Sequence, residues 1–541
     1  MRFGTLLFLA LPLAAAAQTK PVAARVDSVL ALMTLEELVG QTNQYNGFWN
    51  ATGPMPEGND WVEARVAALK RGGVGSVLNV AGVDEVRALQ KVAVEETRLG
   101  IPLLFGLDVI HGYQTLTPIP LAEAASWDME AIKNSARAAA REATADGINW
   151  TFAPMVDISR DPRWGRVMEG AGEDPYLGSR IAEARVNGFQ GADLSDPTTL
   201  AACLKHFAGY GFAVAGRDYH TTDYSAHTLY NWILPPFEAG VKAGAATVMN
   251  AFSAANGIPA TGDSGLVWGE LRGRMGFDGV LVSDWGSIGE MIAHGYAADL
   301  RDAADRALAA GCDVDMESDA YLRYGVELAR RNPADSVRIR EAARRILTLK
   351  FELGVMDDPY RYCGTAKPDV RRDAYEMAVK SSVLLKNSGV LPLAGGVRVG
   401  LTGPLAAEKN GVLGNWRVSA KDQSAQSLAE AVAGAWTYAA SSPHSVGQEA
   451  FHAELTLNQT DTRANDAAIK ALRKHDVLVL AVGEHGYESG EGRSRASLRL
   501  SAVQQDLVRK AMATGKPVVL VVYAGRPLVL ERWIQDGAAA I

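Results

Sequence analysis

The chain has 541 residues, of which 48% are hydrophobic and 21% charged, and its net charge is −8 at pH 7. This balance is typical of a globular protein, and the acidic charge argues against nucleic acid as a partner, because phosphates require a basic patch. The length allows two domains if one of them is a barrel of about 200 to 350 residues. Three scattered cysteines, Cys203, Cys312 and Cys363, exclude a disulfide scaffold and argue against a thiolate zinc site.

The N-terminal segment, residues 1–17, has the pattern of a secretory signal peptide. It carries an arginine, an apolar run from Leu6 to Leu13 and small residues up to Ala17. The run is shorter than the ~20 apolar residues that span a bilayer, and no later stretch reaches that length. We therefore expect a periplasmic or secreted protein with no membrane insertion.

The next block, residues 18–356, alternates short apolar segments with helical patterns. Thr34 opens an early helix with a capping box, because Glu37 stands three residues later. Alternation of this kind is typical of βα units around a parallel sheet, and about seven units favour a (β/α)8-like TIM barrel over an open sheet. The expected strands are Gly75–Val80, Pro102–Leu107, Asn149–Met155, Leu200–Leu204, Ala245–Met249, Gly279–Val282 and Cys312–Met316. The expected helices between them are Asp84–Leu99, Met129–Ala145, Tyr176–Gln190, Leu229–Lys242, Ser264–Arg274 and Ala303–Ala310.

Polar residues stand at the carboxyl ends of several of these strands. In a barrel the active site is assembled at those ends, so such residues would converge on one mouth. The alternative is that they are ordinary caps and turns. The residues in question are Asp108, Lys205, His206, Asn250, Asp284 and Asp315.

A loop-like segment, residues 357–373, predicts a linker to a second domain, residues 374–541. The second block again alternates strands and helices and is typical of an α/β sandwich. Its last residues, Ala538–Ile541, read as the start of a further strand, so we expect an incomplete, C-terminally truncated sheet with an exposed apolar edge. The expected strands are Val397–Thr402, Trp436–Ala439, Val477–Val482 and Val518–Tyr523, with helices that include Ala464–Leu472 and Ala502–Thr514.

Carboxylates are the best candidates for catalysis. The chain has no Gly-x-Ser-x-Gly elbow, phosphate-binding loop or His-Glu-x-x-His motif, and no ligand cluster with credible spacing, so we expect neither a metal nor an organic cofactor. Hydrolysis of a glycosidic bond usually needs two carboxyl groups, one on each side of the bond. Asp284 is a candidate nucleophile because it follows an apolar strand, and Trp285 offers a flat face for a sugar ring. The alternative is a helix cap beside a core tryptophan.

The chain resembles glycoside hydrolase family 3, and most of all its periplasmic or secreted bacterial β-glucosidases. The resemblance runs from about residue 22 to residue 541, and the number and order of the matching segments argue against coincidence. In the first block the matching pieces are Met33-Thr-Leu-Glu-Glu37, Gly106-Leu-Asp108, Pro118-Ile-Pro-Leu121, Asp161-Pro-Arg-Trp-Gly-Arg166, Lys205-His-Phe207 and Val282-Ser-Asp-Trp285. In the second they are Val383-Leu-Leu-Lys-Asn387 and Leu391-Pro-Leu393.

The resemblance implies a retaining double displacement at a site between the two domains, with Asp284 as the nucleophile. It also implies four residues that grip the sugar hydroxyls and one that lines the same subsite: Asp108, Arg166, Lys205, His206 and Met249.

The acid/base is expected on the loop that follows the strand Val477–Val482. The spacing found in bacterial β-glucosidases favours Glu491, and a cereal-type spacing favours Glu488. Glu484 directly follows the strand and is expected to be structural.

The predicted activity is that of an exo-acting β-glucosidase on terminal, non-reducing β-D-glucosyl residues of glucosides or oligosaccharides. A single-domain branch that removes N-acetylglucosamine is not matched, because Ala208 stands where that branch has proline, and Tyr224 stands where it has serine. A β-xylosidase and a secreted sugar-binding pseudoenzyme remain the alternatives. The sequence does not indicate an oligomeric state.

Overall fold

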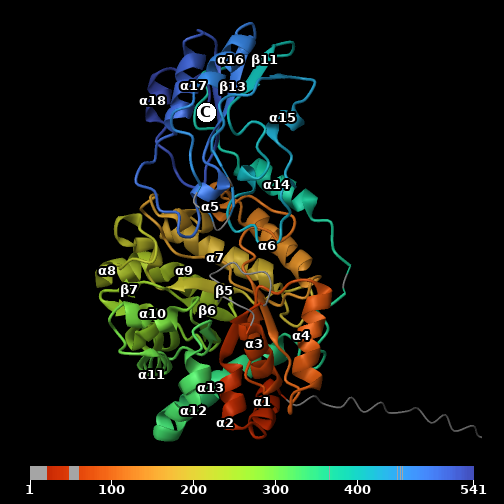
Figure 1. The fold of residues 1–541 in the computed structure, drawn as a ribbon, viewed down its shortest axis with the longest axis vertical. Helices are drawn as coiled ribbons and strands as arrows, with labels where there is room; N and C mark the ends of the chain where they lie inside the picture. The colour runs from red at the N-terminus through yellow and green to blue at the C-terminus, as the bar shows by residue number, and fades with distance from the viewer. Residues whose placement is uncertain (1–20, 48–59, 365, 448, 451–452, 454) are drawn as a thin grey trace, which may run out of the picture.

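The structure is a computed structural model that describes residues 21–47, 60–364, 366–447, 449–450, 453 and 455–541. A larger part, red to green in Figure 1, carries a smaller blue part on one of its ends. The predicted signal peptide, residues 1–17, lies outside the described residues. Among the helices that are described, none is long and apolar enough to cross a membrane.

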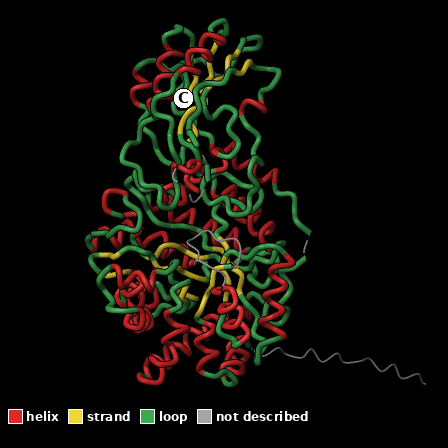
Figure 2. The backbone as a smooth tube through the Cα atoms, viewed as in Figure 1, coloured by secondary structure: helices red, strands yellow, loops and turns green. Residues whose placement is uncertain are grey.

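The larger part is a barrel of eight parallel strands, which confirms the predicted fold class (Figure 2). The strands form one run in the order β10-β1-β2-β3-β4 and another in the order β5-β6-β9. Parallel bridges join the runs at both ends, Trp150 with Ala201 and Val282 with Val314, so the barrel closes. Its strands are β1 (Asn43–Asn46), β2 (Ser76–Leu78), β3 (Leu104–Leu107), β4 (Trp150–Thr151), β5 (Cys203–Phe207), β6 (Thr247–Asn250), β9 (Val280–Val282) and β10 (Asp315–Met316).

Strand β1 has no counterpart among the expected strands, because its sequence, Asn-Gln-Tyr-Asn, contains no apolar run. All four residues are buried nonetheless. Their amide N–H₂ groups have partners inside the barrel: Asn43 Nδ2 donates to Gly73 O at 3.0 Å and Gln44 Nε2 donates to Ser76 Oγ at 3.0 Å. The oxygens Asn43 Oδ1 and Gln44 Oε1 have no partner among the described residues. A polar strand is tolerated in a core only when such partners exist.

The helices surround the strands close to where the patterns predict them, and Thr34 and Glu37 form the expected capping box. The predicted helix over residues 229–242 is divided into a π-helical turn, η4 (Leu229–Ile233), and α9 (Leu234–Lys242). Prolines at 235 and 236 lack the N–H that an α-helix would need there. The segment Gly265–Arg274 is a π-helix, η6. The other helices of the barrel are α1 (Val22–Leu30), α2 (Leu35–Gln41), α3 (Asp60–Lys70), α4 (Val83–Glu95), α5 (Pro120–Ala125), α6 (Met129–Thr144), α7 (Pro175–Gln190), α8 (Ala226–Thr228), α10 (Ser287–Ala293), α11 (Leu300–Ala310), α12 (Ala320–Arg331) and α13 (Pro333–Glu352).

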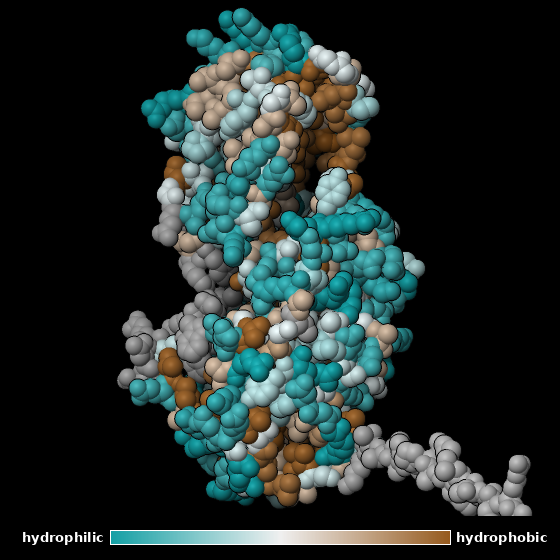
Figure 3. Space-filling model, turned by 90° about the vertical axis from the view of Figure 1, so that its right-hand side faces the viewer, coloured by the Kyte–Doolittle hydropathy of each residue, from teal (hydrophilic) through white to brown (hydrophobic). Residues whose placement is uncertain are grey.

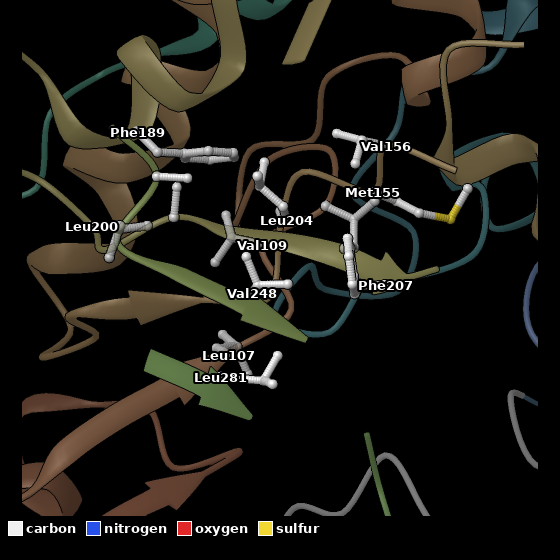
Figure 4. Close-up of a cluster of buried hydrophobic side chains, with 14 of the residues drawn as sticks. Leu107, Val109, Met155, Val156, Phe189, Leu200, Leu204, Phe207, Val248 and Leu281 are labelled. Carbon is white, nitrogen blue, oxygen red and sulfur yellow. The ribbon is translucent and has the colours of Figure 1, made fainter. Parts of the chain in front are cut away.

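Apolar side chains hold the strands against this helical layer (Figure 4). Leu204 of β5 and Val248 of β6 are fully buried, and Phe189 of α7 packs in the same cluster. Burying one such side chain contributes about 1.5–3 kcal/mol. The strands are therefore rigid supports for the polar residues at their carboxyl ends.

The smaller part is built on a four-stranded parallel sheet in the order β12-β11-β13-β14. The predicted strand at Ala538–Ile541 forms only bridges, in which Ala540 pairs with Val519 and Asn387. Half of β14 is only partly buried, and apolar surface gathers on one side of this part in Figure 3. The strands are β11 (Val399–Thr402), β12 (Thr437–Tyr438), β13 (Val477–Gly483) and β14 (Val518–Tyr523), and the helices are α15 (Leu428–Ala431), α16 (Arg463–Leu472), α17 (Ala502–Met512) and α18 (Glu531–Gln535).

Helix α14 (Arg371–Ser381) begins within the predicted linker and packs on the barrel, against α5 and α6. Met377 is buried there with Ala124 and Ile132, and Lys380 donates to Asp128. The domain boundaries at residues 356 and 373 remain predictions. Helix α14 spans the boundary at residue 373, yet it packs on the barrel.

Candidate active site

The candidate site lies where the carboxyl ends of the barrel strands meet loops of the smaller domain. Asp108 follows β3, Lys205 and His206 belong to β5, and Asp284 follows β9. Arg166 comes from the short 3-10 helix η1 (Gly165–Glu169). The loop that carries the three candidate glutamates follows β13 of the other domain.

Asp284 presents one carboxylate oxygen to the site. Its Oδ1 accepts from the backbone N–H of Trp285 at 2.7 Å. Its Oδ2 has no hydrogen-bond partner among the described residues and lies 3.5 Å from Nε2 of His206. The Trp285 ring is half-buried against the barrel core, so the short Ser-Asp-Trp turn leaves an unpaired oxygen beside an aromatic face.

Arg166 is the hub of the site. Its guanidinium donates to both carboxylate oxygens of Glu169, at 2.8 and 3.0 Å. The same group contacts His206 Nε2 at 3.0 Å and lies 3.6 Å from Oε1 of Glu491. The salt bridge to Glu169 and the contacts with the site are therefore both present: Nε and Nη2 donate to Glu169, Nη2 also contacts His206, and Nη1 faces Glu491.

His206 is a neutral imidazole in the folded chain. Burial, together with the charges of Arg166 and Lys205, holds its pKa well below the usual range. Its Nδ1 lies 2.8 Å from Asp157 Oδ2, so Nδ1–H donates to that carboxylate and Nε2 accepts from Arg166. Asp157 has no place in the sequence prediction, and it is the residue that orients this imidazole.

Lys205 and Asp108 form a buried ion pair, with Nζ and Oδ1 2.7 Å apart. Burial works to lower the pKa of Lys205, but the carboxylates of Asp108 and Glu169 outweigh it and raise that pKa. The ammonium lies 5.1 Å from the ring centre of Trp416, which comes from the smaller domain. Met249 of β6 is buried in the barrel core beside the half-buried ring of Trp285.

Glu491 lies in the charged network of the site. Its Oε1 accepts from the Tyr219 hydroxyl at 2.8 Å. Burial raises its pKa, and although Arg166 works against this, the nearby carboxylates of Asp218 and Glu169 raise it further. A carboxyl that keeps its proton near neutral pH is suited to general acid catalysis.

Glu488 and Glu484 are occupied by structural contacts. Glu488 is bonded to His444 Nε2, accepts from His485 N at 2.8 Å and pairs with Arg495 at 2.9 Å. Although burial works to raise the pKa of Glu488, these partners outweigh it and lower that pKa. Glu484 pairs with Arg495 at 2.7 Å and with Arg526 at 3.1 Å. Glu488 is therefore held as a carboxylate, and Glu484 is tied to two arginines although burial raises its pKa.

The carboxyls of Asp284 and Glu491 influence each other's ionisation. Burial raises the pKa of Asp284 to about 8, and the charge of Glu491 contributes to the rise. Two carboxyls that repel each other in a buried site hold one proton between them. Asp284 faces the cations of Arg166 and Lys205, whereas Glu491 faces one of these cations and two carboxylates. The cations stabilise the carboxylate form of Asp284 and the carboxylates stabilise the acid form of Glu491, which are the forms that the reaction needs.

Backbone contacts dock the glutamate loop onto the barrel. Gly490 N donates to Gly165 O at 2.8 Å, and Arg495 N donates to Arg163 O at 2.9 Å. A Cβ atom on Gly165 would stand 2.2 Å from the Gly490 carbonyl, so the close approach requires glycine there.

Three residues of the site have no signal in the analysis of motifs: Tyr219, Asp157 and Trp416. Trp416 packs over the Arg166 guanidinium at 5.8 Å as well as over Lys205. A tryptophan in the glycine-containing loop Gly414-Asn-Trp416 was the available hint, but only docking of the domains shows which cations it covers. The predicted roles of the site residues remain predictions.

One group of possible metal ligands occurs among the described residues, formed by Glu408, Glu449 and His485. Nδ1 of His485 accepts from Tyr487 N at 3.1 Å, so the hydrogen of the neutral ring is on Nε2. That nitrogen lies 3.3 Å from Glu449 Oε2 and has no hydrogen-bond partner among the described residues. Because it carries the hydrogen of the ring, it offers no lone pair to a metal in this arrangement.

Comparisons with known proteins agree with this arrangement. The glycosyl hydrolase family 3 N-terminal domain model matches residues 34–349, and the C-terminal domain model matches residues 382–541. The chain is 37% identical to a periplasmic beta-glucosidase of Salmonella typhimurium over 95% of this chain and 69% of that protein. It is 32% identical to a putative beta-xylosidase of Formosa agariphila over 96% of this chain and 70% of that protein.

The chain is also similar to solved structures of β-glucosidases. The chain is similar to the beta-glucosidase from Listeria innocua in complex with isofagomine, with a TM-score of 0.88, 37% identity, and coverage of 96% of this chain and 71% of that one. The same enzyme in complex with glucose aligns with a TM-score of 0.87 and 37% identity over 96% of this chain and 72% of that one.

Proposed function

Because the chain belongs to glycosyl hydrolase family 3 and is a glycoside hydrolase, we propose that it is a retaining, exo-acting β-glucosidase. Its substrates are glucosides and oligosaccharides with a terminal, non-reducing β-D-glucosyl residue. The observation that carries the proposal is the pairing of two carboxyls from different domains, Asp284 and Glu491, in one network through Arg166.

In the first step Asp284 is the nucleophile. Its unpaired Oδ2 attacks the anomeric carbon while Glu491 transfers its proton to the leaving oxygen, so the glycosidic bond breaks and a glycosyl ester forms. The cations of Arg166 and Lys205 favour the ionised form of Asp284, and the contacts of Glu491 with carboxylates favour its protonated form.

In the second step the roles of Glu491 are reversed. The ionised carboxylate takes a proton from water, and the water oxygen attacks the anomeric carbon and releases Asp284. The product keeps the anomeric configuration of the substrate because two inversions have occurred.

The sugar is held by charged groups and aromatic faces. Asp108 accepts hydrogen bonds from hydroxyls, and Lys205 and Arg166 donate to them. Trp285 offers a stacking face, and Met249 lines the same subsite. His206, held neutral by burial and by the charges of Arg166 and Lys205, lies 3.5 Å from the nucleophile Asp284.

The relatives support glucose as the sugar. The beta-glucosidase from Listeria innocua is known in complexes with glucose and gluconolactone, and a variant of it in complex with laminaribiose. β-Xylosidase activity is the second candidate, because relatives in Formosa agariphila at 32 and 33% identity are named as a putative beta-xylosidase and a beta-xylosidase. A periplasmic or secreted location is supported by the N-terminal pattern and by the name of the Salmonella relative.

The test uses the purified protein and aryl β-glucoside, β-xyloside and β-N-acetylglucosaminide. We expect the glucoside to be the best substrate and its first product to be β-glucose. A 2-fluoro-glucoside should form a stable ester on Asp284, identified by mass spectrometry of peptides. The control is Asp223→Asn, which changes an exposed carboxylate and should leave the labelling of Asp284 as in wild type. Labelling of another residue, or an α-anomer as first product, would contradict the mechanism, and absence of all three activities would favour a pseudoenzyme.

A further inference from the structure

We propose that Asp218 is a positioning residue for the acid/base, because its carboxylate joins the barrel to the backbone next to Glu491. This rests on the proposed role of Glu491. Asp218 lies in the barrel loop between β5 and α8, outside the motifs that carry the family resemblance.

On the barrel side, two donors fix the carboxylate. Oδ1 accepts from Trp164 Nε1 at 2.8 Å and from the Tyr210 hydroxyl at 2.5 Å. Both donor residues are fully buried. The orientation of this carboxylate is therefore determined by the core of the barrel and not by solvent.

On the other side, the second oxygen reaches the smaller domain. Oδ2 accepts from the backbone N–H of Gly492 at 2.7 Å, and Gly492 directly follows Glu491. Ser494 continues the contact, because its hydroxyl accepts from Asp218 N at 3.0 Å and donates to Gly216 O at 2.8 Å.

The contacts with Asp218 are one attachment of the middle of the loop, where Gly492 and Ser494 are exposed. Arg526 is another, because its Nη2 donates to the carbonyl oxygens of Glu488 and Arg493 at 2.5 and 2.9 Å. The ends of the loop are attached separately, through Gly490 and Arg495. Asp218 holds the residue directly after Glu491, so its loss should misplace the acid and reduce proton transfer.

The charge of Asp218 acts on the same group. Burial is the main reason that the pKa of Glu491 is raised, and the Asp218 carboxylate raises it further. The other groups that act on Glu491 are the Arg166 guanidinium and the Tyr219 hydroxyl, which lower its pKa, and the Glu169 carboxylate, which raises it. Glu491 in turn raises the pKa of Asp284 and of Glu290 on α10. Position and charge thus make two separable predictions about Asp218.

The test compares Asp218→Asn with wild type on two β-glucosides. The amide has nearly the shape of the carboxylate, but it removes the charge and turns an N–H₂ group toward a donor. General acid catalysis contributes about 10²–10⁴-fold. We expect kcat/KM to fall ~10- to 100-fold on a disaccharide, which needs a proton on its leaving oxygen, and less than ~3-fold on 2,4-dinitrophenyl glucoside, whose leaving group needs little protonation.

The pH profile separates the two effects. Removal of the charge lowers the pKa of Glu491, so the alkaline limb of kcat/KM should move to lower pH in Asp218→Asn. Ser494→Ala weakens the docking and keeps the charge, so it should reduce activity on the disaccharide without moving the limb. Asp223→Asn, the same change at an exposed carboxylate of the same loop, should do neither.

The inference would be overturned if Asp218→Asn lost kcat/KM equally on both substrates and kept the alkaline limb of the pH profile in place. It would also be overturned if this variant behaved like wild type. Far-ultraviolet circular dichroism reports whether the variant is folded. If Asp218→Asn is not folded, Tyr210→Phe replaces it in the test, because this change removes one donor to the Asp218 carboxylate. A selective loss of activity on the disaccharide is again expected, and equal activities would contradict the inference. The Glu491→Ala variant is measured beside them: if it lacks the leaving-group pattern, the proposed acid/base is wrong, and if it alone shows the pattern, only the role of Asp218 is wrong.

Discussion

The charge of Asp284 destabilises the folded chain, so the isosteric change Asp284→Asn should stabilise it above pH 5. Burial raises the pKa of this carboxyl to about 8, against about 3.9 for an exposed aspartate. Between these values the folded chain binds a proton that the unfolded chain has released. Stability therefore falls as pH rises from about 4 to about 8. Among the described residues the carboxylate has one hydrogen bond, from Trp285 N to Oδ1, and the amide oxygen of asparagine can keep it.

One proton bound on folding gives a slope of about 1.4 kcal/mol for each pH unit. Between pH 5 and pH 7 the wild type should therefore lose about 3 kcal/mol of unfolding free energy relative to Asp284→Asn. In the variant the repulsion of Glu491 is also relieved, which acts in the same direction. Active sites often carry such a cost in stability, because function requires a charge in a buried place.

Urea unfolding of wild type and variant, followed by circular dichroism at pH 5, 6, 7 and 8, measures this difference. Asp223→Asn is the control, since its carboxylate is exposed and its substitution should give a difference near zero at every pH. A constant difference between wild type and Asp284→Asn across the pH range, or a variant less stable than wild type at pH 7, would refute the reasoning.

Two further predictions concern buried charges outside the reacting pair. Glu488→Gln should lower the unfolding free energy by about 1–3 kcal/mol, because the carboxylate has charged and backbone partners. The variant should hydrolyse the disaccharide and the dinitrophenyl glucoside in the same ratio as wild type. If the ratio is instead that of Glu491→Ala, Glu488 is the acid/base. Burial lowers the pKa of Lys350 to about 7, so the folded chain binds fewer protons than the unfolded chain between about pH 7 and pH 10 and its stability rises with pH there. The advantage of Lys350→Met over wild type, measured by urea unfolding, should therefore shrink by about 1.4 kcal/mol per pH unit from pH 8 to pH 10, and an advantage that does not change with pH would contradict this.

Local patterns were sufficient for most of the fold. Apolar runs and helical periodicity predicted seven of the eight barrel strands, because each is buried by its own apolar side chains. Strand β1 was missed because its burial depends on partners distant in the chain. The side-chain amide of Gln44 donates a hydrogen bond to Ser76, and that of Asn43 donates one to Gly73. No local pattern carries that information.

The candidate nucleophile could be predicted from the sequence, because Asp284 stands at the end of an apolar strand within a recognisable motif. The choice between Glu488 and Glu491 could not be made from spacing alone. Their pKa values shift in opposite directions only after folding: His444 and Arg495 lower the pKa of Glu488, whereas burial and the carboxylates of Asp218 and Glu169 raise that of Glu491.

The sequence by itself determined the family, the order of the elements and the residue types that the chemistry needs. Only the tertiary structure decided the charge states and the neighbours. Asp157 orients the neutral His206, Trp416 covers Lys205 from the other domain, and Asp218 reaches the backbone beside Glu491. The physical reason is that pKa values and hydrogen-bond partners depend on burial and on distance in space, and the domains that supply these groups meet only in the folded chain.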